Sequence, residues 1–102
     1  MASGVNVIDY ATLSAVNTGA TTLVADASPT LPARAKRAFI TCETYPARWR
    51  ADGTAPTQTT GHVLAKDDSI SFTGTDYRQL LERIQFIGTA SGTAALKITY
   101  FD

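Results

Sequence analysis

Apolar and polar residues alternate with a period of two over several stretches of this chain. In the segment Lys36–Tyr45, Ile40 and Cys42 fall on one side, whereas Thr41 and Glu43 fall on the other. Successive side chains of a β-strand point to opposite faces, so this pattern predicts strands with one buried face. The predicted core collects the apolar members of such segments together with the single tryptophan: Ile40, Cys42, Trp49, Ile70, Phe72, Ile84, Phe86, Leu96, Ile98 and Tyr100.

Turn-forming residues such as Asp52-Gly53 and Ser91-Gly92 recur roughly every ten residues between these segments. Short strands at this spacing are typical of a β-sandwich or barrel. The predicted strands are Thr21–Ala25, Lys36–Tyr45, Ala47–Ala51, Gly61–Ala65, Ser69–Thr73, Arg83–Thr89 and Ala94–Phe101. An eighth strand is expected within Val5–Val16, which gives about seven or eight strands in total.

Two segments depart from this alternation. Between Asp76 and Leu81 the apolar residues follow helical spacing, with Asp76 as a capping residue, so we expect a helical turn near 76–81. Near the N-terminus, Tyr10 and Val16 suit a helical period and Val7 suits a strand. Residues 1–20 are therefore either an N-terminal arm or a first strand, and residues 21–102 are the predicted β-sandwich domain.

The composition supports an all-β protein of one domain. Threonine and alanine each occur 16 times in the 102 residues, whereas lysine occurs three times and glutamate twice. Threonine favours strands, and lysine and glutamate are the common surface helix formers. A chain of this length builds one modest hydrophobic core.

The charge balance argues for a protein that works in an assembly. The formal net charge is zero and only 18% of the residues are charged. Binding to nucleic acid needs a basic face, so nucleic acid is not an expected partner. A weakly charged surface also does little to keep identical molecules apart, which favours self-association. No apolar run is long enough to span a membrane and the N-terminus lacks a secretory signal pattern, so a cytoplasmic origin is expected.

The residues that usually carry chemistry are too few for an enzyme. His62 is the only histidine and Cys42 the only cysteine, so no disulfide or cysteine-based metal site is expected. His62 is interpreted as an edge residue and Cys42 as a small buried one. A weak calcium site at Asp67-Asp68 is conceivable, but the spacing matches no calcium-binding loop and the pair suits a turn. We therefore predict no catalytic residue, no cofactor and no metal.

The stretch RWRADGTAPT supports two interpretations. On a strand, Trp49 points one way while Arg48 and Arg50 point the other. The first interpretation places Trp49 in the core and the arginines on the outer face beside Glu43 or Asp52. The second turns Trp49 outward as a stacking surface for a glycan, helped by Tyr45 or Tyr77.

Five short motifs follow one another in the C-terminal half of the chain: an Arg-aromatic-Arg strand, a D-G-T-x-P-T turn, a Gly-led strand, a strand ending in F-I and a final I-T-Y-F strand. They lie at Arg48–Arg50, Asp52–Thr57, Gly61–Leu64, Arg83–Gly88 and Lys97–Phe101. Through these motifs, this half of the chain resembles small virion proteins of tailed bacteriophages.

The resemblance implies a small, jelly-roll-like β-sandwich with a structural role. It implies a capsid decoration (cement) protein that binds the major capsid protein as a homo-oligomer, or an accessory at the neck or tail of the virion. A host-glycan-binding module is the alternative from another class. Arginine and aromatic residues are common at interfaces, and the expected interface residues are Arg48, Arg50, Tyr45, Phe39 and Tyr10.

Overall fold

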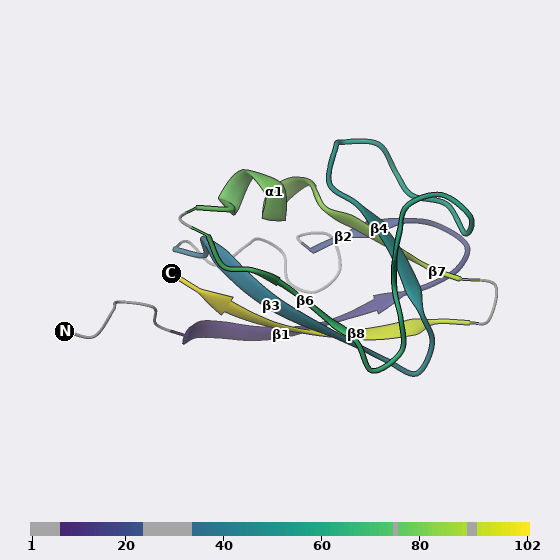
Figure 1. Cartoon of the computed structure of the whole chain (residues 1–102), viewed down its shortest axis with the longest axis horizontal. Helices are drawn as coiled ribbons and strands as arrows, with labels where there is room; N and C mark the ends of the chain where they lie inside the picture. The colour runs from purple at the N-terminus through teal and green to yellow at the C-terminus, as the bar shows by residue number, and fades with distance from the viewer. Residues whose placement is uncertain (1–6, 24–33, 75, 90–91) are drawn as a thin grey trace.

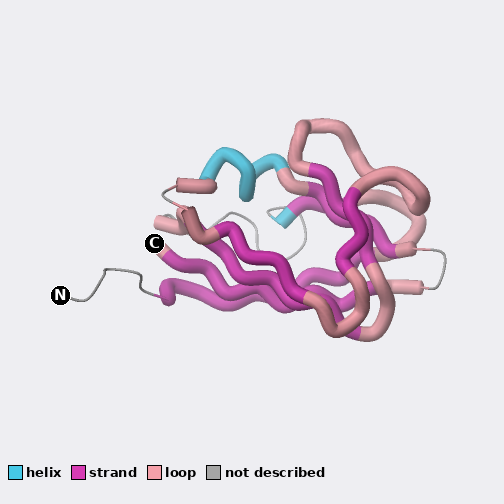
Figure 2. Tube along the Cα trace, in the orientation of Figure 1, coloured by secondary structure: helices cyan, strands magenta, loops and turns pink. Residues whose placement is uncertain are grey.

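The computed structural model describes residues 7–23, 34–74, 76–89 and 92–102 as a two-layered all-β domain (Figures 1 and 2). Within these residues eight strands and one short α-helix form. They are β1 (Val7–Ala15), β2 (Thr21–Thr22), β3 (Arg37–Glu43), β4 (Ala47–Arg50), β5 (His62–Leu64), β6 (Ser69–Phe72), α1 (Arg78–Arg83), β7 (Gln85–Gly88) and β8 (Ala94–Phe101).

The strands are divided between two four-stranded antiparallel sheets. Sheet A has the order β1-β8-β3-β6, and sheet B has the order β2-β7-β4-β5. Strand 1 therefore pairs with strand 8, 2 with 7, 3 with 6 and 4 with 5. This pairing results when a long hairpin, with strands 1–4 as one arm and 5–8 as the other, is rolled into two layers. It is the eight-stranded jelly roll that the resemblance implies.

The core lies between the two sheets and follows the predicted alternation. Along β8 the residues at even positions are buried and those at odd positions are partly exposed. Eight of the ten predicted core residues are buried: Ile40, Cys42, Phe72, Ile84, Phe86, Leu96, Ile98 and Tyr100. The other two, Trp49 and Ile70, are partly buried and pack against this core. Both lie in strands next to, or at, the edge of a sheet, where the opposite layer covers them less fully.

The helix differs from the prediction at both ends. It spans Arg78–Arg83, two residues later than expected, so β7 begins at Gln85 and the predicted start of this strand at Arg83 is wrong. Asp76 does cap an amide, because its Oδ1 accepts the N–H of Arg78 at 2.9 Å, but Tyr77 occupies the N-cap position. No helix in the described parts of the chain is long and apolar enough to cross a membrane.

The N-terminal residues that the structure describes belong to the sandwich. Val7–Ala15 forms β1 and pairs with β8 from Val7↔Phe101 to Ala15↔Ala94. A bulge between Val7 and Asp9 interrupts the pairing near its start. Residues 1–6 of the expected arm, and positions 24 and 25 of the predicted strand Thr21–Ala25, lie outside the described residues.

Candidate interaction surfaces

The five expected interface residues lie at three separate places. Tyr10 and Phe39 lie on the outer face of sheet A, whereas Arg48 and Arg50 come from β4 in sheet B. Tyr45 lies in the turn between β3 and β4, where its ring is against Gly92. These residues therefore form no single patch, and each place has its own geometry.

The outer face of sheet A brings Tyr10 and Phe39 into one row. Thr99 of β8 pairs with Tyr10 on one side and with Phe39 on the other, so the two rings flank it. Tyr10 is 58% exposed and Phe39 is 39% exposed. In the next row Val7, 66% exposed, pairs with Phe101. Exposed apolar side chains thus gather at one end of this face.

The edge strands of the two sheets offer little room for the addition of another strand. Three of the four edge strands have only two to four residues: β2, β5 and β6. In the long edge strand β1, Asp9 Oδ1 accepts the N–H of Tyr10, and directly after the strand Val16 O accepts the N–H of Gly88. Short edges and blocked backbone groups are the usual protection against unwanted strand pairing.

On sheet B the loop between β4 and β5, residues 51–61, folds back over the outer face. Arg48 holds it from below: Nε donates to Gln58 O at 3.0 Å and Nη1 donates to Gly61 O at 2.8 Å. From the loop, Gln58 Nε2 donates to Asn17 O at 2.6 Å in the connection after β1. The Arg48 side chain therefore binds two backbone carbonyls in the second half of this loop.

Two apolar residues outside the main core, Ile87 in β7 and Pro56 in this loop, are also buried. Ile87 pairs with Arg48 and so points to the outer face, yet it is only 6% exposed and lies apart from the main core. Pro56 in the loop is buried. Gly61 has φ +128°, and a Cβ there would lie 3.0 Å from Trp49 O and 3.2 Å from Pro56. A side chain at this position would force the loop away from the sheet.

Arg50 pairs with Asp52, as the first interpretation of the RWRADGTAPT stretch expects. Its Nε lies 3.1 Å from Asp52 Oδ1, and Nη2 lies 2.5 Å from Oδ2. The hydrogen bond from Arg50 and that from the Thr54 N–H lower the pKa of Asp52 below its ordinary value. The pair fixes the turn at which the chain leaves β4.

Trp49 lies at the margin of the sandwich between two other rings. Its ring centroid is 4.8 Å from that of His62 and 5.8 Å from that of Phe72, which it meets edge-on. Phe72 in turn lies 5.7 Å from Tyr77. Phe72 therefore separates Trp49 from Tyr77, and Tyr45 lies elsewhere, so the aromatic platform that a glycan site requires is not assembled.

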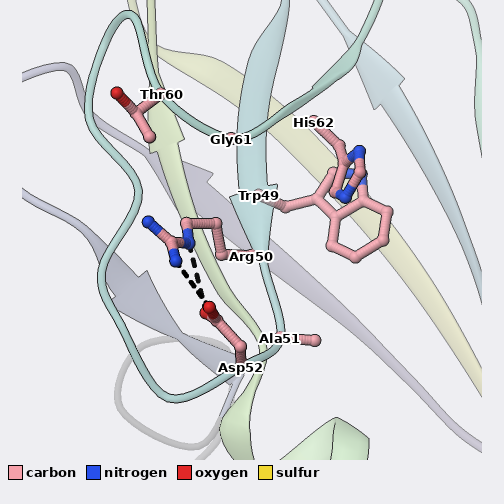
Figure 3. Close-up of a pocket in the computed structure, with 7 residues that line it drawn as sticks. All are labelled: Trp49, Arg50, Ala51, Asp52, Thr60, Gly61 and His62. Atoms are coloured by element: carbon pink, nitrogen blue, oxygen red, sulfur yellow. Dashed lines mark hydrogen bonds and ion pairs between the residues drawn. The ribbon is translucent and has the colours of Figure 1, made fainter.

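An open hollow of about 590 Å³ lies where β4 and β5 separate. Figure 3 shows that its polar and aromatic pairs do not converge: Trp49 and His62 point to one side of β4, and Arg50 with Asp52 to the other. Thr60 lies on the side of the ion pair. The hollow therefore borders the β4–β5 loop, and its two pairs do not enclose one small molecule.

The residues considered for chemistry, Cys42, His62 and Asp67, make contacts within the domain. Cys42 is buried and its thiol lies 3.2 Å from Tyr45 O, and burial raises its thiol pKa. His62 is exposed at the start of β5 with its ring on Trp49. Asp67 adopts φ +69° in the turn before β6, where its N–H donates to Cys42 O. Within the described residues no three histidine, cysteine or acidic side chains group together as a metal site would require.

Comparisons of this chain with protein-family models, with curated proteins and with solved structures found no match.

Proposed function

We propose that this protein is a non-enzymatic structural component of a tailed-bacteriophage virion, and that it decorates the capsid by binding the major capsid protein as an oligomer. One observation supports this most directly. Residues of the phage-like pattern that are distant in sequence pack as one unit: Arg48 holds Gly61, and the β4 strand that carries Arg48 lies between β5 and β7. The pattern therefore describes a fixed surface element, the β4–β5 loop on sheet B.

A fixed loop suits attachment to a large partner. Residues 52–55 and 57–60 are exposed, while hydrogen bonds from Arg48 and Gln58 hold the loop on the domain. A loop that is already ordered loses little conformational entropy on binding. Val63, which is 56% exposed, lies beside Arg48 on the same outer face. We propose that the β4–β5 loop and Val63 contact the capsid.

The jelly roll and the surface charge are consistent with this role. Capsid proteins and lectins both use jelly rolls, so the fold alone leaves the function open. The zero net charge and the exposed apolar residues Val7, Tyr10, Phe39 and Val63 favour a protein that packs against neighbours. Many weak contacts repeated around a shell then combine through avidity.

Electron cryomicroscopy of the intact particle tests the proposal. Density for this chain repeated across the shell, with the β4–β5 loop toward the capsid protein, is the expected result. Density at the neck or tail would instead make the protein a head–tail or tail accessory. Val63→Asp should reduce binding of purified protein to preformed capsids at least tenfold. Quenching of Trp49 fluorescence by host glycans, with no capsid binding, would overturn the proposal.

A further inference from the structure

The outer face of sheet A has two unlike ends. At one end its side chains are large: Val7, Tyr10, Phe39 and Phe101. At the other end they are small: Thr12, Ser14, Thr41 and Ala95. Serines of β6, Ser69 and Ser71, border the face beside β3. The apolar side chains therefore project further from the sheet at one end of the face than the small side chains do at the other.

The charges on this face are divided in the same way. Arg37 lies in the row of Phe101, at the end with large side chains, where its guanidinium also donates to the carbonyls of Gly74 and Asp102. Glu43 lies in the row of Ala95, at the end with small side chains, and is exposed. Lys97 lies between them, in the row of Thr41. Arg37 at one end of the face and Glu43 at the other therefore carry opposite charges.

A twofold axis parallel to the sheet and perpendicular to its strands, placed between the rows of Thr99 and Lys97, would bring the large-residue end of one copy against the small-residue end of the other. Rotation about it places Phe101 opposite Ala95 of the second copy, Phe39 opposite Thr41, and Tyr10 opposite Thr12. It also places Arg37 opposite Glu43, and Lys97 opposite Thr99. Each large side chain then meets a small one, and the unlike charges meet. Facing sheets that pack in this way lie about 10 Å apart.

We infer that two copies of this chain associate through the outer faces of their A sheets, with Tyr10 and Phe39 of each copy packed on the small-residue end of the other. A second copy is the occupant that this arrangement fits, because a twofold interface uses the same patch on both partners and must be self-complementary. The zero net charge imposes no overall repulsion between identical molecules.

The area of this face determines how tightly the two copies are expected to associate. Four strands spaced by about 4.8 Å, and seven residues of β3 with a rise of about 3.4 Å, give a footprint of roughly 19 by 24 Å. Interfaces of this size belong to the smaller, reversible class. We therefore expect a dimer that dissociates on dilution into the micromolar range. Avidity on the shell would strengthen it, which is where the inference connects with the proposed function.

Sedimentation equilibrium of the purified, full-length protein tests this inference. The wild type should show a monomer–dimer equilibrium. Phe39→Asp and Glu43→Arg should each weaken dimerisation at least tenfold, the first by placing a charge on the apolar end and the second by opposing Arg37. Val63→Asp is the matched control, since it puts the same charge on a similarly exposed apolar residue of sheet B and should leave the dimer unchanged.

The outcomes separate this inference from the proposed function. A wild type that stays monomeric at high concentration would overturn the inference, as would a dimer unaffected by both variants or one lost equally with Val63→Asp. Thermal melts check that each variant is folded, and Glu43→Arg remains informative if Phe39→Asp is not, because Glu43 is exposed. A protein that dimerises but does not bind capsids would support dimerisation through sheet A and contradict the proposed role in capsid decoration.

Discussion

Arg48 Nη1 lies 2.8 Å from the carbonyl oxygen of Gly61, and this contact joins β4 to the residue before β5 across a separation of 13 residues in sequence. The same guanidinium also holds Gln58 O. The Arg48 side chain therefore holds the β4–β5 loop against sheet B through these two hydrogen bonds.

Arg48→Ala should loosen this loop and destabilise the domain. It removes two charge-assisted hydrogen bonds, and we expect the free energy of unfolding to fall by about 1–3 kcal/mol. Amide hydrogen exchange in residues 51–61 should become faster. Arg50→Ala is the control, because its exposed partner Asp52 gives a pair of little net value, and it should leave the unfolding midpoint almost unchanged. Equal effects of the two variants would contradict this assignment.

Gly88→Ala should be strongly destabilising. A Cβ at Gly88 would lie 2.5 Å from Ala15 O and 2.6 Å from Gly92 O, and backbone atoms cannot rotate away. We expect a loss of about 3 kcal/mol, measured by urea unfolding. Gly19→Ala is a matched control, since a Cβ at Gly19 meets nothing within 4 Å. A Gly88→Ala protein as stable as Gly19→Ala would refute the close approach of the strands.

Tyr100→Phe should leave the stability at neutral pH unchanged or raise it by about 1 kcal/mol. The Tyr100 hydroxyl is buried and has no hydrogen-bond partner among the described residues. Removing an unpaired buried polar atom from an apolar core relieves its desolvation cost. The thermal midpoint measures the change. A clear loss of stability would mean that the hydroxyl makes a hydrogen bond.

The same variant should change how stability depends on alkaline pH. Burial raises the pKa of Tyr100 from an ordinary value of 10.0 to about 12, and the charge of Asp9 adds to the effect. Above pH 10 the unfolded chain releases this proton while the folded one keeps it, so wild-type stability falls between about pH 10 and 12. Tyr100→Phe should show a shallower fall than wild type, and Tyr10→Phe, at an exposed position, should not. Parallel curves for all three proteins would contradict the shift.

Trp49→Ala should cost less than a full core truncation. Trp49 is only partly buried, against His62 and Phe72, whereas Phe86 is fully buried in the neighbouring strand. We expect losses of about 2 kcal/mol for Trp49→Ala and about 4 kcal/mol for Phe86→Ala in chemical unfolding. The reverse order would place Trp49 in the centre of the core.

The strands were the most predictable part of the fold. β8 spans the predicted Ala94–Phe101, because Leu96, Ile98 and Tyr100 alternate without interruption. The predicted boundaries were wrong where the alternating pattern meets helical spacing. Arg83 is the last residue of α1, whereas the sequence predicted that a strand begins there. At that junction both periods fit the same residues, and packing against the sheets decides between them.

The surfaces were less predictable than the strands. The sequence suggested that Arg48 faces a partner, but its acceptors are the carbonyls of Gln58 and Gly61, and backbone acceptors leave no signature in a sequence. Ile87 lies on the outer face of sheet B opposite Arg48, yet it is only 6% exposed. Proline and glycine, as at Pro56 and Gly61, are typical of a constrained loop, but they do not show onto which sheet it folds.

The pairing of β1 with β8 brings Val7 next to Phe101, so the two most distant strands of the described chain close the fold together. Closing the short β4–β5 loop costs the least chain entropy, and each further pair is easier once the previous one has formed. We therefore expect folding to proceed outward from β4–β5, slowly because of its high contact order, with β1–β8 last. Until β8 has been synthesised, β1 lacks its only partner among the described strands and β3 has β6 alone, which leaves the backbone of both strands exposed to aggregation.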